Sequence, residues 1–143
     1  MKRILLIVTC LTLTYNWVNA QINPAKIDII RDSFGVPHIF GKTDPDVAYG
    51  LAWAHAEDDF GTIQQSLMAG KSMLAQYQGK KGASIDYIIH LLRIPELVEA
   101  KYESDLSPAF KKLLEGYAAG LNAYAAAHPE LPAQRLYMSW AAQ

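Results

Sequence analysis

Residues 31–59 bring together the side chains that most resemble a reactive cluster. Arg31, His38 and His55 can hold or exchange a proton or bind an anion, and the acidic run 57–59 follows them. Histidine beside carboxylates is the composition of many general-base sites and metal sites. The stretch therefore raises three alternatives: an active site, a metal site, or residues that support a site elsewhere.

The spacing within this stretch does not favour a metal site. A zinc-binding helix places two histidines four residues apart around a glutamate, whereas His55 stands alone here. Glu57, Asp58 and Asp59 are consecutive, so on a helix they point in different directions. The twelve-residue calcium-loop pattern is absent from the sequence. We expect instead that Asp58 ends a buried helix and pairs with Arg31 or with backbone amides.

The same stretch lacks the setting of a catalytic nucleophile. His38 has the chemistry of a general base, but no serine lies in a G-x-S-x-G pattern. Ser33 belongs to the turn sequence "DSFG", where serine is common for conformational reasons. We therefore favour structural roles for the hairpin residues: Arg31 and Asp32 hold the turn, Gly35 reverses the chain and Pro37 stiffens it.

The first 20 residues have the three-part layout of a secretory signal peptide. Basic residues 2–3, an apolar run over residues 4–13 and small residues up to Ala20 follow one another. The segment is too short for a membrane span, and a membrane anchor is the less favoured alternative. We expect a mature chain that begins at Gln21, a periplasmic or extracellular location, and no membrane span after signal removal.

Composition excludes several classes of function for this mature chain. Cys10 leaves with the signal peptide, so residues 21–143 have no disulfide, no thiol nucleophile and no cysteine ligand for zinc. Loss of Lys2 and Arg3 changes the net charge from −1 to −3. Nucleic-acid binding needs a basic face, so we expect no nucleic-acid partner.

Alternation and turn residues predict a β-hairpin over residues 26–40. Residues 26–31 and 36–40 have strand patterns, and "DSFG" has turn residues. Two strands alone are marginally stable in water. We therefore expect the hairpin to add to a sheet whose other strands belong to a larger protein.

The rest of the chain is predicted to be mainly helical. Thr43 or Asp44 caps a helix whose residues 47–56 are apolar on every side, as in a helix that is buried all round. An amphipathic helix follows over 63–77, with a kink near Gly61.

Further segments complete the predicted helical region. Residues 79–84 are predicted to form a loop, 85–94 a short helix before Pro95, and 96–102 a further turn or two. The last helix begins with Ser107 and Pro108 and ends at His128. Gly116 and Gly120 on this helix allow a neighbouring element to approach closely.

The residues alone indicate an α-rich segment with one hairpin and no self-sufficient catalytic set. The apolar helix and the unpaired hairpin both favour the front part of a larger protein. An exported, non-enzymatic helical module that binds a partner or small ligand is the alternative. On the residues alone, the function stays open.

The segment 26–60 resembles the start of the α chain of the penicillin acylase family, which includes acyl-homoserine-lactone acylases. The pattern is R-D-x-x-G-x-P-H-I, a polar gap, and then Y-G-x-x-x-x-x-A-x-D. A second stretch, "GYAAGLNAY" at residues 116–124, is similar to the family's G-Y-A-x-G-x-N-A. The matching residues are Arg31, Asp32, Gly35, Pro37, His38, Ile39, Tyr49, Gly50, Ala56, Asp58, Gly116, Tyr117, Gly120 and Asn122.

The resemblance implies an N-terminal-nucleophile hydrolase with a four-layer αββα fold, an α+β class in which this chain is the α-rich part. Family members are exported precursors that cut themselves into α and β chains. The N-terminal serine of the β chain attacks the acyl group of an amide. Penicillins, cephalosporin derivatives and N-acyl-homoserine lactones are substrates in the family.

The resemblance places no catalytic, substrate-binding or metal-binding residue in this chain. It implies that residues 21–143 are a partial α-chain region, whose partners are the β chain of the same precursor and a small N-acyl substrate. No cofactor is expected in this chain, although the full-length protein can hold a calcium ion. The motif residues are expected to be structural: Arg31, Asp32, Gly35, Pro37, His38, Tyr49, Gly50, Asp58, Gly116, Tyr117, Gly120 and Asn122.

Overall fold

The computed structural model describes residues 22–131. The predicted signal peptide, residues 1–20, lies outside the described residues. A short 3-10 turn, η1 (Pro24–Lys26), leads into two strands and five helices. The strands are β1 (Asp28–Arg31) and β2 (Pro37–Phe40), and the helices are α2 (Asp44–Gly70), α3 (Leu74–Gln78), α4 (Lys80–Leu91), α5 (Ile94–Asp105) and α6 (Pro108–Ala127).

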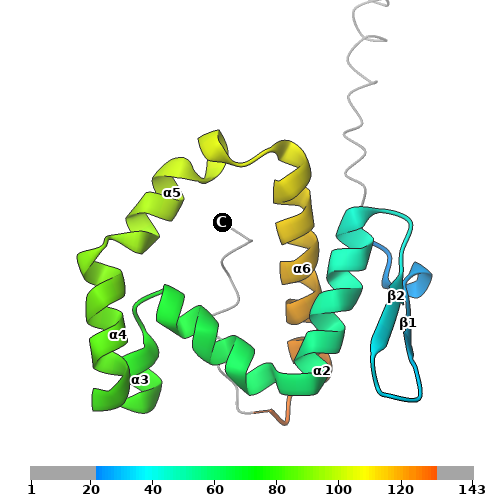
Figure 1. Cartoon of the computed structure of the whole chain (residues 1–143), viewed down its shortest axis with the longest axis horizontal. Coiled ribbons are helices and arrows are strands. Elements are labelled where there is room, and N and C mark those ends of the chain that lie inside the picture. The colour runs from blue at the N-terminus through cyan, green and yellow to red at the C-terminus, as the bar shows by residue number, and fades with distance from the viewer. Residues whose placement is uncertain (1–21, 132–143) are drawn as a thin grey trace, which may run out of the picture.

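Helix α2 is the central element of this arrangement. Figure 1 shows the first half of α2 between the hairpin and α6, while its second half leads away to α3, α4 and α5. These three helices form an arm on the side of the molecule opposite the hairpin. The α-rich composition with one hairpin agrees with the α+β class predicted from the sequence.

The predicted hairpin is confirmed, with strands slightly shorter than expected. Strands β1 and β2 are antiparallel, and Ile29 lies opposite Ile39 in the register. Both of these isoleucines are half-buried on the face toward α2, because alternate residues of a strand point to opposite faces. Ile30 and Phe40 on the other face are 58% and 56% exposed.

A capping box starts α2 at Thr43. The Thr43 hydroxyl accepts a hydrogen bond from the Asp46 amide, and the Asp46 carboxylate accepts one from the Thr43 amide. Of the two predicted caps, the structure selects Thr43, with Pro45 in the first turn.

The predicted kink near Gly61 is present in α2 and lies at Asp59. Asp59 has non-helical dihedrals, φ −159° and ψ 74°, which separate two helical halves. Its carboxylate accepts a hydrogen bond from the Thr62 amide at 3.0 Å. Asp59 therefore acts as an N-cap for the second half, and this satisfies an amide that the break would otherwise leave without a partner.

The apolar segment 47–56 is buried on most sides but not all. Ala52, Ala54 and Ala56 are 0–1% exposed, and Tyr49 is 8% exposed. Val47 is 37% exposed, and His55 is also exposed. Within residues 22–131, the expectation of a helix buried all round is therefore wrong at these two positions.

The arm differs most from the sequence-based expectation. The predicted helix 63–77 is interrupted after Gly70, where Ser72 has φ +56° and the chain turns into α3. The predicted loop 79–84 is helical, because α4 begins at Lys80. Asp86 of α4 accepts hydrogen bonds from the amides of Leu74 and Ala75, at 2.8 and 2.7 Å. This contact between α3 and α4 favours a helix over residues whose composition, "GKKGAS", is typical of a turn.

Helix α5 is longer than predicted, and helix α6 has its predicted ends. Helix α5 extends beyond the predicted residues 96–102 and takes Pro95 into its first turn, where a missing amide hydrogen has no cost. Helix α6 has the predicted ends: the Ser107 hydroxyl accepts from the Phe110 amide, and His128 is the C-cap.

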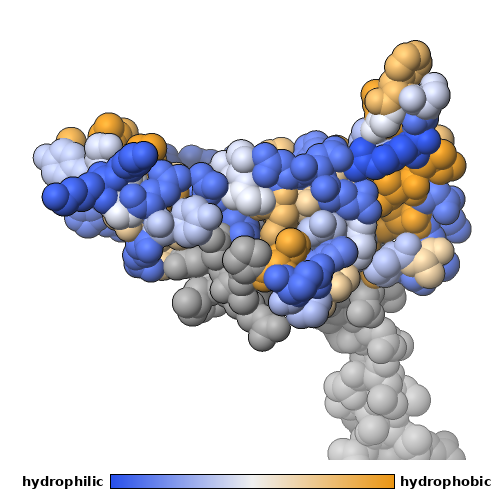
Figure 2. All heavy atoms as spheres, turned by 90° about the horizontal axis from the view of Figure 1, so that it is seen from below, coloured by the Kyte–Doolittle hydropathy of each residue, from blue (hydrophilic) through white to orange (hydrophobic). Residues whose placement is uncertain are grey.

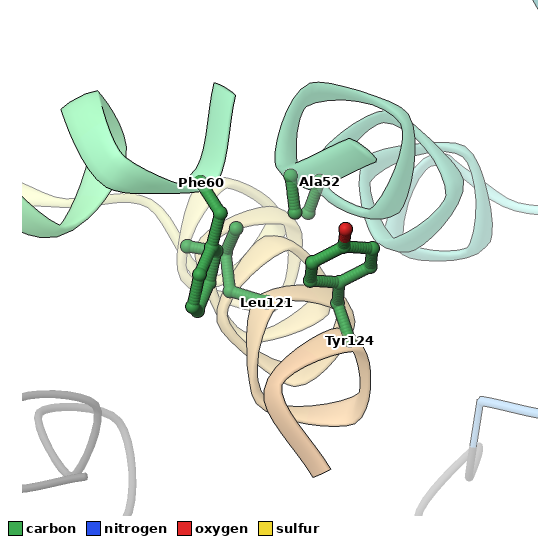
Figure 3. Packing of buried hydrophobic residues seen from close by; sticks show 5 residues of the cluster. Ala52, Phe60, Leu121 and Tyr124 are labelled. Atoms are coloured by element: carbon green, nitrogen blue, oxygen red, sulfur yellow. The ribbon is translucent and has the colours of Figure 1, made fainter. Parts of the chain in front are cut away.

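The main core lies where α6 crosses α2. Figure 3 shows Phe60 and Ala52 of α2 packed against Leu121 and Tyr124 of α6. The Tyr124 ring also meets the Trp53 ring edge-on, with centroids 5.4 Å apart. A second, smaller core joins Met68 and Leu74, at the junction of α2 and α3.

Glycines set the spacing between α2 and α6. A Cβ atom added at Gly116 would overlap the Pro45 carbonyl oxygen, and one at Gly120 would overlap that of Tyr49. The two helices therefore approach at backbone contact distance, which confirms the prediction for these glycines.

Gly120→Ala should therefore destabilise the fold, because the added methyl group forces α6 away from α2. Overpacking of this kind typically costs about 1–3 kcal/mol. Gly70→Ala is the matched control, since an added Cβ there meets nothing within 4 Å and alanine favours helix by about 0.5–1 kcal/mol. Urea unfolding followed by circular dichroism measures both; equal stability of the two variants would contradict the close approach.

Candidate functional site

Arg31 joins the hairpin to α2 at the end of β1. Its guanidinium donates to the Gly35 carbonyl at 2.9 Å and to the Ala54 carbonyl at 3.3 Å. It also pairs with Asp58 at 2.8 Å. The predicted contact between Arg31 and Asp58 is therefore present. One planar side chain holds the turn of the hairpin and the middle of α2 together.

Glu57 also contacts Arg31, and its place in the acidic run 57–59 did not predict this contact. Its carboxylate accepts from Arg31 at 3.1 Å and, through the other oxygen, from the Trp53 indole at 2.9 Å. Glu57 and Asp58 reach one partner although they are consecutive, since the forked guanidinium offers several donors. The available signal was the i,i+4 spacing of Trp53 and Glu57 on one helix face.

Asp32 organises the turn that Arg31 closes. One carboxylate oxygen accepts from the amides of Phe34 and Val36, at 2.8 and 3.0 Å, and the other lies 3.3 Å from His38 Nε2. These hydrogen bonds, with the amides first in importance, hold the pKa of Asp32 below its usual value. Gly35 has φ +83°, a conformation that favours glycine.

Pro37 and Gly50 complete the contact between the hairpin and α2. Pro37 starts β2 opposite Arg31, where a proline is tolerated in a strand. A Cβ at Gly50 would lie 2.6 Å from Ile39 and 3.0 Å from Ile27, so this glycine makes room for the hairpin's inner face.

The second motif lies on α6 against the same helix. Tyr117 and His55 are joined by a hydrogen bond of 3.2 Å between the phenol and Nδ1. Partial burial raises the pKa of Tyr117. Asn122, by contrast, is exposed on α6. The structure thus brings together all the motif residues except Asn122 along the hairpin, α2 and α6.

The contacts of this arrangement join the hairpin, α2 and α6. In residues 22–131, the histidines that form hydrogen bonds contact Asp32, Tyr117 and Glu130, and none contacts a serine hydroxyl. An activated nucleophile needs such a base. No group of three or more histidine, cysteine, aspartate or glutamate side chains converges in the described part of the chain. No described helix is long and apolar enough to cross a membrane.

Replacing Arg31 should weaken the contact between the hairpin and α2, whereas replacing Lys26 should not. Arg31→Lys keeps the charge but loses the fork that contacts two carbonyls and two carboxylates. We expect a lower unfolding midpoint for Arg31→Lys, whereas Lys26→Arg leaves it unchanged. Hydrogen exchange of β1 amides measures the local effect; unaltered protection would argue against this role.

Lowering the pH should destabilise the hairpin turn, because it protonates the Asp32 carboxylate. The folded state lowers this pKa, so the contribution to stability is complete above the unfolded pKa of about 3.9 and is lost as the pH falls through the folded pKa. Asp32→Asn should therefore be less stable than the parent at pH 7, with a difference that narrows below about pH 4. The difference between the urea unfolding midpoints of the two proteins, measured from pH 3 to pH 7, reports this effect. A difference that does not change with pH would refute the role of Asp32.

The sequence of this chain is similar to the sequences of known acylases. The chain is 30% identical over 124 residues to a penicillin G acylase of Escherichia coli, covering 83% of this chain. It is 28% identical over 111 residues to an acyl-homoserine lactone acylase of Pseudomonas fluorescens, covering 72% of this chain. In each case the match spans 14% of the relative's length.

The structural comparison points to the same fold. A thermostable penicillin G acylase from Alcaligenes faecalis matches with a TM-score of 0.63 and 24% identity, over 80% of this chain and 62% of the other. The sequence model of the penicillin amidase family matches residues 26–141. This match includes both motifs and the helices between them, and the chain belongs to the penicillin amidase family.

Proposed function

We propose that this chain is the N-terminal α-chain region of an exported amide hydrolase. The full-length protein would remove an acyl group from a penicillin-like compound or an N-acyl-homoserine lactone. The observation that carries the proposal is the match to the penicillin amidase family over residues 26–141, which includes both motifs. Family membership and the two kinds of similar acylase support the reaction class.

The reacting groups would lie in the part of the protein that follows this chain. The described residues contain no nucleophile paired with a base, and the match spans 14% of the length of the similar acylases. The proposed nucleophile is a serine at the N-terminus of a β chain cut from the same precursor. Its own α-amino group would act as the base, in the manner of activated nucleophiles.

The hairpin supports this assignment because its outer face lacks cover within residues 22–131. Phe34 at the turn is 91% exposed and Val36 is 52% exposed, in addition to Ile30 and Phe40. The described sheet has only the two strands of this hairpin. A further strand from the β chain would cover the apolar residues and satisfy a free strand edge.

The proposal predicts that activity belongs to the full-length protein and not to residues 21–143. The full-length protein should hydrolyse a phenylacetyl amide or a fatty-acyl homoserine lactone, and an acyl-chain series should identify the preferred group. Substitution of the β-chain N-terminal serine by alanine should reduce turnover by a factor of about 10³ or more.

Two outcomes would contradict the proposed function. Amide hydrolysis by purified residues 21–143 would place the reacting groups in this chain. A reading frame that ends at Gln143, with no β-chain serine encoded nearby, would favour the alternative of an exported, non-enzymatic binding module. The binding alternative would then be tested by ligand titration.

A further inference from the structure

Helix α6 ends in a turn that folds back over the main core. Figure 2 views the molecule from the side on which α6 ends in Figure 1, and this face has both hydrophilic and apolar residues. The Leu131 amide donates to the His128 carbonyl at 3.2 Å, and the Leu131 side chain packs against the cluster that contains Phe60 and Tyr124. We call residues 128–131 the closing turn, because they cover this end of the core.

His128 is the C-cap of α6, and its ring contacts two aromatic rings. Its amide donates to the Tyr124 carbonyl at 3.1 Å. The imidazole lies 4.3 Å from the Tyr124 ring, centroid to centroid, at an angle of 33°, and 6.5 Å from the Trp53 ring. Tyr124 is buried, and the Trp53 indole donates to Glu57 at 2.9 Å. Both rings are therefore held in place by their own contacts.

The Glu130 carboxylate lies beside the same imidazole, 2.9 Å from His128 Nδ1. Hydrogen bonds from its own backbone amide and from His128 lower the pKa of Glu130, so this side chain stays charged to a lower pH than usual. A carboxylate can only accept, so Nδ1 is the donor. A neutral imidazole can keep this hydrogen bond, and a protonated imidazole adds a charge that strengthens it.

The end of α6 also favours a positive charge. The last carbonyl groups of a helix lack partners within the helix and have a partial negative charge. Helix α6 has no basic residue in its last turn, so His128 is the group of the closing turn that can become positive. Three neighbours therefore favour the protonated imidazole: the helix end, the Glu130 carboxylate and the face of the Tyr124 ring.

We propose that His128 is a pH switch, which in its protonated form holds the closing turn and the end of α6 against α2. Histidine is the side chain that ordinarily changes its charge between pH 5 and pH 8. In residues 22–131, Glu57 reaches this site through Trp53, but it is paired with Arg31. Glu130 is therefore the charged partner that decides the effect. The proposal goes beyond the proposed function, because it requires no reaction.

The closing turn should be held most firmly in mildly acidic solution. An ordinary histidine is protonated below about pH 6.5, and the contribution of its charge is lost as the pH rises through that value. Glu130 has a lowered pKa, so its contribution is lost only as the pH falls below the ordinary carboxyl value of about 4.3. Both charges are therefore present at about pH 5.5.

Hydrogen exchange of the full-length protein tests this switch. The protection of the amides in residues 124–131, corrected for the intrinsic exchange rate at each pH, should be at least about threefold higher at pH 5.5 than at pH 8. His128→Gln should abolish this difference, because glutamine keeps a polar side chain that does not titrate. His90→Gln is the matched control, since His90 is exposed on α4 and its ring has no contact within residues 22–131; it should keep the difference.

The outcomes decide between the switch and its absence. Equal protection at the two pH values in the parent would overturn the proposal, and so would a difference that His128→Gln keeps or that His90→Gln loses. Glu130→Gln should reduce the difference without abolishing it, because the helix end and the Tyr124 ring remain; an unchanged difference would overturn the role of Glu130. None of these readouts involves catalysis, so a full-length protein without acylase activity would contradict the proposed function alone.

Discussion

The described structure depends on the close packing of one helix on two sides. The first half of α2 contacts the hairpin through Gly50 and contacts α6 through Gly116 and Gly120. Each glycine removes the side chain that would hold the neighbouring element away. Close approach maximises dispersion contacts between small residues such as Ala52 and Ala56, which are almost fully buried. The family motifs are therefore largely a set of packing requirements around α2.

Charged residues add a second kind of contact between the hairpin and α2. Arg31 connects the hairpin turn to α2 by contacts to carbonyls on both elements and to two carboxylates of α2. A cluster of arginine, histidine and acids can look like an active site in the sequence, although each member here is used by a neighbour. His38 contacts Asp32, and His55 contacts Tyr117. These contacts tie each histidine to a residue of the hairpin or of α6.

The sequence predicted most accurately those features that local chemistry determines. The hairpin turn and the Ser107 cap follow from residue types at short spacing, whereas the pair of Arg31 with Asp58 was expected because a carboxylate at a buried helix end needs a partner. It failed where contacts between distant residues outweighed local preference. Asp86 stabilises the start of α3, and α4 begins within a glycine- and lysine-rich segment that local rules assign to a loop. The contact of Glu57 with Arg31 was missed, since the neighbouring Asp58 was the expected partner of Arg31.

The central claim is that the histidines and acids of residues 31–59 support the fold and take no part in the reaction. The direct test is the kcat of the full-length protein with His38→Gln and with His55→Gln, measured per folded molecule. The account predicts kcat within about twofold of the parent, with changes confined to stability. A loss of about 10²–10⁴ in kcat, the usual contribution of a general base, would contradict it.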